Sequence, residues 1–267
     1  LTINPPSLAR AAVIHDFDGD GKSDRWSWRP NDGRWLIQHS SNGSLGLRRL
    51  GSLGDVAVPA DYDGDGLTDL AVFTAAESRW QIVYSTTGEA RDESFGAAGG
   101  QAFPADYDGD RKADLAIRTA QGEWQIRRTT DGEIISFTLG GENEQAVIGD
   151  FDGDGLTDTA VYRASARLAL MRHSHDGTIQ AMHLPYAEGL PLTGDFDGDG
   201  KAELAFWSAD KSQLCFKRSS DQQEQQLTIN GTALWLGDYD GDGKSDCANQ
   251  QASGWQIRLS SRAWQEF

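Results

Sequence analysis

Short apolar runs recur along the chain in a fixed order, separated by polar, glycine-rich segments. An apolar stretch such as residues 57–60 precedes each polar loop, and an alternating stretch such as residues 70–73 follows it. A third stretch places large apolar residues at positions i and i+2, which puts both side chains on one face of a strand. The predicted pairs are Trp35/Ile37, Trp80/Ile82, Trp124/Ile126, Leu168/Leu170, Leu214/Phe216 and Trp255/Ile257. A weaker fourth stretch, as in residues 134–139, completes four predicted strands per unit.

One nine-residue acidic loop occurs six times and sets the period of the chain. The copies span residues 16–24, 61–69, 106–114, 150–158, 195–203 and 238–246. Their first aspartates are 45, 45, 44, 45 and 43 residues apart. Four short strands per unit of about 40–50 residues are typical of a propeller blade. We therefore predict one all-β domain over residues 1–267, a six-bladed β-propeller of four-stranded antiparallel blades with one loop per blade.

The two ends of the chain compete for one place in this fold. Residues 1–4 repeat the sequence of residues 227–230, which lies in a predicted fourth strand, so the N-terminus can complete the last blade. Residues 262–267 can take the same place. The sequence leaves open which segment closes the propeller.

Composition narrows the function classes. The chain has 41 Asp and Glu against 24 Lys and Arg, a net charge of −17. Such an excess of acid argues against a nucleic-acid or anionic-membrane surface. No apolar run approaches the length needed to cross a bilayer, so we expect no membrane insertion.

The acidic loops have the composition of calcium sites. Carboxylates at loop positions 1, 3, 5 and 9 bring four oxygen donors together, which is unfavourable without a cation. Hard oxygen donors in a flexible loop suit Ca²⁺, and glycine at position 6 permits a positive φ. The six loops hold 24 of the 41 acids, and six Ca²⁺ ions would bring the net charge from −17 to −5. An EF-hand is excluded, since position 12 is never Glu: it is Ser27, Val72, Ile117, Val161, Phe206 or Asn249.

With six such loops in phase with the Trp/Ile strands, the chain resembles the FG-GAP and VCBS-type repeats of bacterial secreted proteins, which are related to the integrin α-subunit propeller. The resemblance implies up to six Ca²⁺ ions, each held by the acids at positions 1, 3, 5 and 9 and by the backbone carbonyl of position 7. The implied ligands are Asp16, Asp18, Asp20, Lys22 and Asp24; Asp61, Asp63, Asp65, Leu67 and Asp69; Asp106, Asp108, Asp110, Lys112 and Asp114; Asp150, Asp152, Asp154, Leu156 and Asp158; Asp195, Asp197, Asp199, Lys201 and Glu203; and Asp238, Asp240, Asp242, Lys244 and Asp246.

Two copies depart from the pattern. Arg111 replaces the position-6 glycine, so the third loop must strain or place a non-glycine residue at positive φ, and we expect this site to be the weakest. Glu203 replaces the last aspartate and keeps a carboxylate on a longer side chain.

Other candidate chemistry has simpler interpretations. The aromatic residue at position 2 of each loop is expected to pack between blades. Five tryptophans fall outside the repeat pattern and are the better candidates for ligand contacts: Trp26, Trp28, Trp207, Trp235 and Trp264. His173 and His175 lack a third metal ligand at a sensible spacing, so we expect ordinary surface histidines. Cys215 and Cys247 are expected to be unpaired, although a bridge between blades stays open.

We find no nucleophile elbow, phosphate loop or acid/base pair outside the repeats, so we predict a non-enzyme. The leading hypothesis is a calcium-stabilised binding or adhesion module, secreted, periplasmic or at a cell surface, either monomeric or part of a larger surface protein. It would recognise a protein or a glycan on the face away from the calcium loops, at connections such as residues 30–33, 75–78, 120–122 and 209–212. The alternatives are a lectin with several equivalent blade sites, a polysaccharide-active enzyme, or a structural spacer.

Overall fold

The computed structural model describes residues 15–184, 189–251, 254–262 and 265–266. These residues fall into two compact units, within His15–Glu142 and Asn143–Phe267. Each unit holds three antiparallel sheets whose strands follow one another in chain order. No helix of the described part is long and apolar enough to span a membrane.

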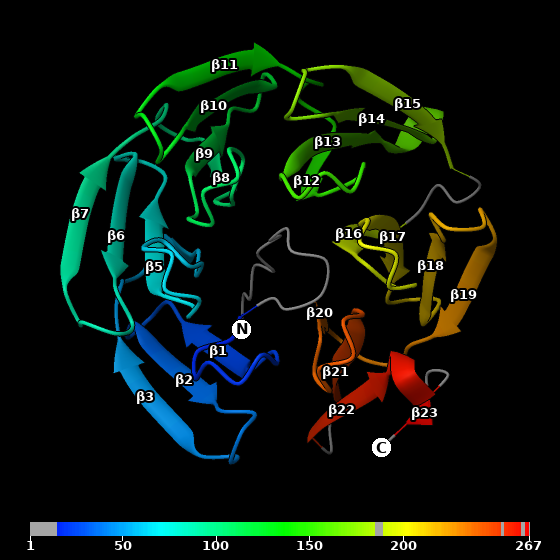
Figure 1. The fold of residues 1–267 in the computed structure, drawn as a ribbon, viewed down its shortest axis with the longest axis horizontal. Helices are drawn as coiled ribbons and strands as arrows, with labels where there is room; N and C mark the ends of the chain where they lie inside the picture. Colours follow the sequence, from blue (N-terminus) through cyan, green and yellow to red (C-terminus); the bar gives the residue numbers. More distant parts are fainter. Residues whose placement is uncertain (1–14, 185–188, 252–253, 263–264, 267) are drawn as a thin grey trace. The chain divides into compact units, whose positions relative to one another are not determined.

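The first unit contains the first three sheets (Figure 1). The first sheet has three strands among the described residues: β1 (Arg25–Arg29), β2 (Arg34–Gln38) and β3 (Leu45–Arg49). The second sheet consists of β4 (Asp55–Ala57), β5 (Leu70–Thr74), β6 (Arg79–Val83) and β7 (Ala90–Ser94). The third sheet consists of β8 (Gln101–Ala102), β9 (Leu115–Arg118), β10 (Glu123–Arg127) and β11 (Ile134–Thr138).

The second unit repeats the plan with three four-stranded sheets. The fourth sheet consists of β12 (Gln145–Gly149), β13 (Asp158–Arg163), β14 (Leu168–Arg172) and β15 (Ile179–His183), with the 3-10 turn η1 (Ala164–Ala166). The fifth consists of β16 (Leu190–Gly194), β17 (Glu203–Ser208), β18 (Gln213–Lys217) and β19 (Glu224–Thr228). The sixth consists of β20 (Leu234–Gly237), β21 (Asp246–Gln251), β22 (Gly254–Leu259) and β23 (Gln265–Glu266), with the 3-10 turn η2 (Ser260–Arg262).

Six consecutive sheets of this kind are the blades of an all-β, six-bladed propeller, which confirms the predicted fold class. The fourth strand of the last blade, β23, comes from the C-terminal segment and pairs with β22. The competing residues 1–4 lie outside the described residues.

Apolar side chains of neighbouring blades meet in shared cores. Between the first and second sheets, Trp35 and Ile37 of β2 pack against Leu70 and Val72 of β5. Trp35, Trp80 and Trp124 are fully buried, because the two-residue period of each strand turns them to the same face. The predicted apolar pairs therefore form the cores of the first, second, third and fifth sheets.

The fourth sheet contradicts the predicted pair Leu168/Leu170. Both leucines are only partly buried, whereas Ala169 and Met171 are fully enclosed. Ala169 lies directly opposite Tyr162, which is 1% exposed, so Ala169 and Met171 hold the buried positions of this strand. Since successive side chains of a strand point to opposite faces, an error of one residue exchanges the buried and exposed sets.

Four of the five tryptophans proposed as ligand contacts belong instead to the core. Trp26, Trp28, Trp207 and Trp235 are all 9% exposed or less. The indoles of Trp26, Trp28 and Trp235 pack on neighbouring tryptophan rings; Trp26, for example, stacks on Trp35 with a centroid distance of 5.3 Å. Trp264 lies outside the described residues.

Candidate metal centre

Each acidic loop leads into the second strand of its blade. In the second sheet, the loop joins β4 to β5, and a β-bridge between Ala60 and Asp69 closes its base. The ends of the loop are buried and its middle is exposed: Asp69 has no exposed surface, while Asp65 lies at the surface. The carboxylates of one loop therefore range from fully buried to exposed.

The carboxylate at position 1 organises the turn of the loop. In the second loop, Gly64 N–H donates to Asp61 Oδ1 at 2.7 Å, and Gly66 N–H donates to Asp61 Oδ2 at 2.9 Å. The same two bonds occur in the other five loops. Gly66 has a φ of 88°, which brings its N–H round to the carboxylate.

The carboxylate at position 9 ties the loop to the rest of the blade. In the second loop, Asp69 accepts the N–H of Tyr62 at 2.8 Å and the N–H of Ser85 at 2.7 Å, one on each oxygen. All six loops have this pair of bonds. Glu203 makes both of them, to Phe196 at 2.7 Å and Ser219 at 3.0 Å, so the longer side chain still reaches its partners.

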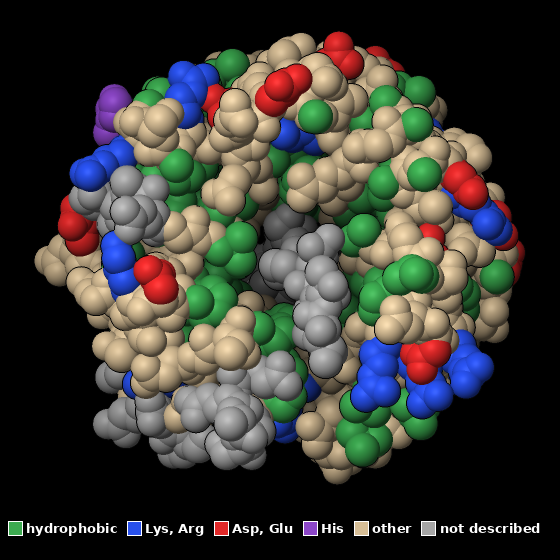
Figure 2. All heavy atoms as spheres, turned by 180° about the vertical axis from the view of Figure 1, so that it is seen from behind, with side chains coloured by type: hydrophobic (Ala, Val, Ile, Leu, Met, Phe, Trp, Pro, Cys, Tyr) green, Lys and Arg blue, Asp and Glu red, His purple; other side chains and the backbone are tan. Residues whose placement is uncertain are grey.

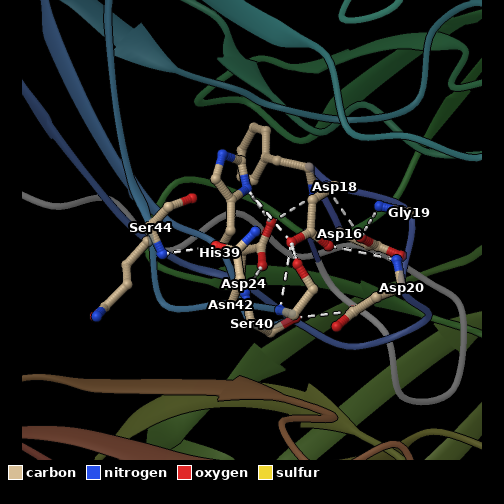
Figure 3. Close-up of polar contacts among 12 residues, drawn as sticks. Asp16, Asp18, Gly19, Asp20, Asp24, His39, Ser40, Asn42 and Ser44 are labelled. Carbon is tan, nitrogen blue, oxygen red and sulfur yellow. Dashed lines mark hydrogen bonds and ion pairs between the residues drawn. The ribbon is translucent and has the colours of Figure 1, made fainter.

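Hydroxyl groups in the turn between the last two strands of a blade bind carboxylates of the acidic loop in five of the six described blades, and sequence reasoning missed them. In the fourth blade, Ser174 Oγ donates instead to the backbone carbonyl of Thr157. In the first loop, Ser40 Oγ donates to Asp20 Oδ1 at 2.8 Å (Figure 3). Ser41 Oγ donates to Asp18 Oδ2 at 2.6 Å. The residue pairs of this turn are Ser40/Ser41, Ser85/Thr86, Thr129/Thr130, Ser219/Ser220 and Ser260/Ser261, with Ser174/His175 in the fourth blade. Their signal was visible, since each pair begins 14 to 16 residues after position 9 of its loop.

The predicted ligand carboxylates converge in the structure. In the fifth loop, oxygens of all four acids lie within 4.8 Å of one another: Asp195, Asp197, Asp199 and Glu203. The first loop brings together Asp16, Asp18 and Asp20, and the second brings together Asp61, Asp63 and Asp69. An all-oxygen donor set of this density can hold a hard cation.

Burial, with repulsion from neighbouring acids, raises the pKa of the position-9 carboxylate in all six loops. Burial, reinforced by the charges of Asp63 and Asp61, raises the pKa of Asp69 to about 7. Burial also raises the pKa values of Asp114 and Glu203 to about 7 and that of Asp246 to about 6. The backbone N–H groups that donate to these carboxylates oppose the rise without cancelling it. A bound cation would lower these pKa values again, because an opposite charge nearby favours the ionised form of a carboxylate.

Neighbouring loops within each unit are linked through their backbones. Thr68 N–H, at position 8 of the second loop, donates to the carbonyl of Asp16 in the first loop at 2.7 Å. The same bond joins the second loop to the third, the fourth to the fifth, and the fifth to the sixth. The position-7 side chain also covers the position-4 glycine of the preceding loop, as Lys112 covers Gly64. A Cβ on Gly64 would lie 3.1 Å from Lys112 Cγ. Position 4 therefore favours glycine for two reasons: this close contact and the positive φ of the turn.

The third loop adopts the backbone shape that we predicted for it. Arg111 has a φ of 71°, in the left-handed region that disfavours residues with a side chain. Its N–H still donates to Asp106 Oδ2 at 2.8 Å, as the glycine does in other loops. The loop thus keeps its hydrogen bonds at the cost of backbone strain.

Two histidines lie beside acidic loops, and one of them, His173, was expected to be an ordinary surface histidine. His173 Nδ1 is 3.1 Å from Asp152 Oδ2 and 3.2 Å from Asp158 Oδ2. His39 holds the same place at the first loop, 3.6 Å from Asp18 and 3.5 Å from Asp24 (Figure 3). The spacing of the histidines alone does not predict these contacts, because the carboxylates come from the acidic loop; Asp158, for example, is 15 residues before His173.

The two cysteines are free, which confirms that they are unpaired. Cys247 is fully buried, and burial raises the pKa of its thiol well above the usual range. The Cys247 thiol therefore serves as a small apolar group of the core, whereas Cys215 is only partly buried.

No protein-family model and no curated protein sequence matches this chain. Solved structures do match across nearly its whole length. A lectin from Agrocybe aegerita that recognises non-reducing terminal N-acetylglucosamine is 15% identical with a TM-score of 0.61, over 96% of this chain and 77% of the lectin. BBS1N, solved in complex with ARL6DN, is 12% identical with a TM-score of 0.56, over 96% of this chain and 79% of BBS1N.

An enzyme is among the similar structures as well. The inactive H270A variant of virginiamycin B lyase from Staphylococcus aureus is 10% identical with a TM-score of 0.56, over 97% of this chain and 86% of the lyase. At these identities, the similarity establishes the β-propeller fold and leaves ligand and activity to be argued from the residues.

Proposed function

We propose that the chain is a calcium-stabilised binding module, with one Ca²⁺ ion in each acidic loop, of the FG-GAP/VCBS type that its sequence resembles. Calcium would be held by the carboxylates of positions 1, 3, 5 and 9, assisted by the position-7 carbonyl. The observation that carries the proposal is the position-9 carboxylate. It is buried in every blade and crowded by other acids, yet the described ion pairs give the loops no cation other than two histidines.

The residues fit this ion better than a softer metal. Each loop offers oxygen ligands and no thiolate, and its backbone already orients the carboxylates through N–H bonds. The role of calcium is structural: it would neutralise the acids that link the first two strands of a blade to its last turn. Ions that bind only the folded state stabilise it by mass action. A need for micromolar to millimolar Ca²⁺ fits a secreted, periplasmic or cell-surface setting.

Thermal unfolding tests the calcium proposal. We expect the melting temperature to rise with CaCl₂ and to fall with EDTA, with a much smaller response to MgCl₂. At a free calcium concentration 100 times the Kd, each site would contribute about 2.7 kcal/mol. A melting temperature that is the same with calcium and with chelator would refute the proposal.

The binding role draws support from propellers of similar fold whose partners are a glycan or a protein. A lyase has a similar fold as well, so the binding role needs a test of its own. A glycan array probed with and without EDTA separates the two partner classes. Several weak equivalent sites would favour the lectin, and no signal on the array would favour a protein partner.

A further inference from the structure

The first sheet carries a row of three arginines that the acidic loops do not explain. Arg29 of β1 lies opposite Arg34 of β2, and Arg34 lies opposite Arg49 of β3. Directly opposite residues share a face of the sheet, so the three guanidinium groups stand side by side. Like charges in this arrangement destabilise a sheet unless an anion lies among them.

Three exposed leucines continue the same face. Leu36 of β2 lies opposite Leu47 of β3, with exposed fractions of 40% and 65%, and Leu45 is also 65% exposed. We call these six residues the arginine–leucine patch: Arg29, Arg34, Leu36, Leu45, Leu47 and Arg49. Figure 2 shows Lys and Arg side chains gathered over the region of β1–β3, at the lower right of that view.

Equivalent rows in other sheets lack this character. In the second sheet the row reads Thr74, Arg79 and Ser94. In the fourth it reads Arg163, Leu168 and His183. In the fifth it reads Ser208, Gln213 and Thr228. The three-arginine row is therefore a property of one blade and not of the repeat.

The charge of the row is only partly balanced. Asp32, in the turn between β1 and β2, lies 2.8 Å from Arg34 Nε. Within the described part of the chain, no ion pair joins Arg29 or Arg49 to a carboxylate. A cationic row on a chain of net charge −17 favours an anionic partner, because complementary charge steers and holds it.

The leucines and the exposed edge of β3 indicate which kind of anionic partner the patch would bind. Leu50 N–H donates to Gly33 O, and His39 N–H donates to Ser44 O. In an antiparallel pair only every second residue turns its backbone N–H and C=O toward the partner strand, so in β3 these are Gly46 and Arg48. The backbone groups of Leu45, Leu47 and Arg49 consequently point outward, where the described sheet has no further strand. Of these groups, the Leu47 carbonyl accepts a hydrogen bond from the exposed Arg48 side chain, which an added strand would displace. An extended peptide can pair with such an edge and place every second side chain on the patch. An acidic polysaccharide would satisfy the arginines but would use neither the leucines nor the edge.

We propose that the arginine–leucine patch binds an acidic, partly apolar segment of a partner protein, which adds to β3 as an extended strand. Its carboxylates pair with the arginine row, and its apolar side chains cover the leucines. The proposal rests on the binding role given above and supplies the chemistry of the partner.

A synthetic peptide provides the test. A fluorescein-labelled peptide of alternating Glu and Val is titrated with the whole chain in calcium-containing buffer, and fluorescence anisotropy reports binding. We expect saturable binding that weakens with salt and is absent for a Lys/Val peptide. The double variant Arg34→Ala/Arg49→Ala should weaken binding about tenfold or more. The matched variant Arg79→Ala, in the same row of the second sheet, should leave it unchanged.

Two further measurements separate the peptide from other anions. Leu45→Ser/Leu47→Ser should weaken the peptide without affecting dextran sulfate, and N-methylation of alternate peptide amides should abolish strand addition. Absence of peptide binding, equal loss in the Arg79→Ala control, or binding of dextran sulfate alone would each overturn the proposal. Calcium-dependent melting without peptide binding would leave the calcium sites standing, whereas peptide binding without a calcium effect would refute only those sites.

Discussion

The two ends of each blade are held by different kinds of hydrogen bond, made by side chains at one end and by the backbone at the other. At the loop end, side chains make the bonds: the carboxylates of Asp61 and Asp69 bind the backbone N–H groups of the loop and the following turn. At the hairpin end, backbone groups make them: the N–H of Phe95 donates to Ser78 O, and that of Leu139 donates to Gly122 O.

This difference explains which residues repeat. Bonds made by side chains require the same residue in every blade, so the loop acids recur six times. Bonds made by the backbone leave the side chain free, and the equivalent left-handed hairpin residue is Gly33, Ser78, Gly122, Arg167 or Ser212. The loop end thus serves the fold and the proposed ions, while the hairpin end can differ from blade to blade and is where a partner could be specified.

The largest effect should come from removing a position-9 carboxylate. Asp114→Ala leaves the N–H groups of Tyr107 and Thr129 without their acceptor and deletes a predicted calcium ligand. Each unsatisfied buried donor costs about 1–3 kcal/mol, so we expect a loss of about 3 kcal/mol or more in the free energy of unfolding, measured by urea denaturation with calcium. Gln121→Ala, at the hairpin end of the same blade, should change it by less than about 0.5 kcal/mol. Comparable losses at the two ends would contradict the division between them.

The next effect is a pH dependence that calcium reverses. In the folded chain without calcium, the pKa values of Asp69, Asp114 and Glu203 are about 7, above the values of 3.8 and 4.5 for free Asp and Glu. The folded state therefore holds protons that the unfolded state releases, and stability in EDTA should fall as the pH rises from about 4 to 7. With saturating calcium the trend should invert, because the metal binds the ionised carboxylates. Melting temperatures across this range, in the two buffers, test both signs.

A third effect compares loops with each other. Arg111→Gly should relieve the positive φ at position 6 of the third loop and stabilise the chain by about 1 kcal/mol. The reciprocal variant Gly66→Arg should destabilise the second loop by a similar amount and weaken its calcium site. Calorimetric calcium titrations of both variants measure the outcome. If neither exchange moves the affinity of its site, the third loop is not the weakest.

The sequence predicts the fold and the clustering of the loop carboxylates because both depend on short, repeated spacings. The period of the acidic loops marks the blades, and a two-residue alternation identifies buried faces such as that of Trp35 and Ile37. Features that depend on contacts between distant segments were missed. The hydroxyls of Ser40 and Ser41 reach their loop across a strand hairpin, and nothing within the loop sequence requires them.

The buried pair predicted for the fourth blade, Leu168 and Leu170, was wrong because burial also depends on neighbouring strands. Leucine is more apolar than alanine, so composition favoured Leu168 over Ala169 as the buried residue. The buried position of this strand is Ala169, directly opposite Tyr162, just as Trp80 lies opposite Phe73 in the second sheet. Which of two adjacent residues is buried depends on how the strand pairs with its neighbours, and the apolar character of one strand alone does not show it.

The smallest effect on stability should come from the turn beside the arginine row. Asp32→Asn removes an exposed ion pair with Arg34, which should change the free energy of unfolding by less than about 0.5 kcal/mol and leave the calcium response intact. The same change frees a guanidinium group for an acidic ligand, so the Glu/Val peptide should bind about two- to threefold more tightly. Asp92→Asn, which removes the equivalent pair with Arg79 in the second sheet, should match it in stability and have no effect on the peptide. Equal effects of the two variants on peptide binding would mean that overall charge, and not the first blade, recruits the partner.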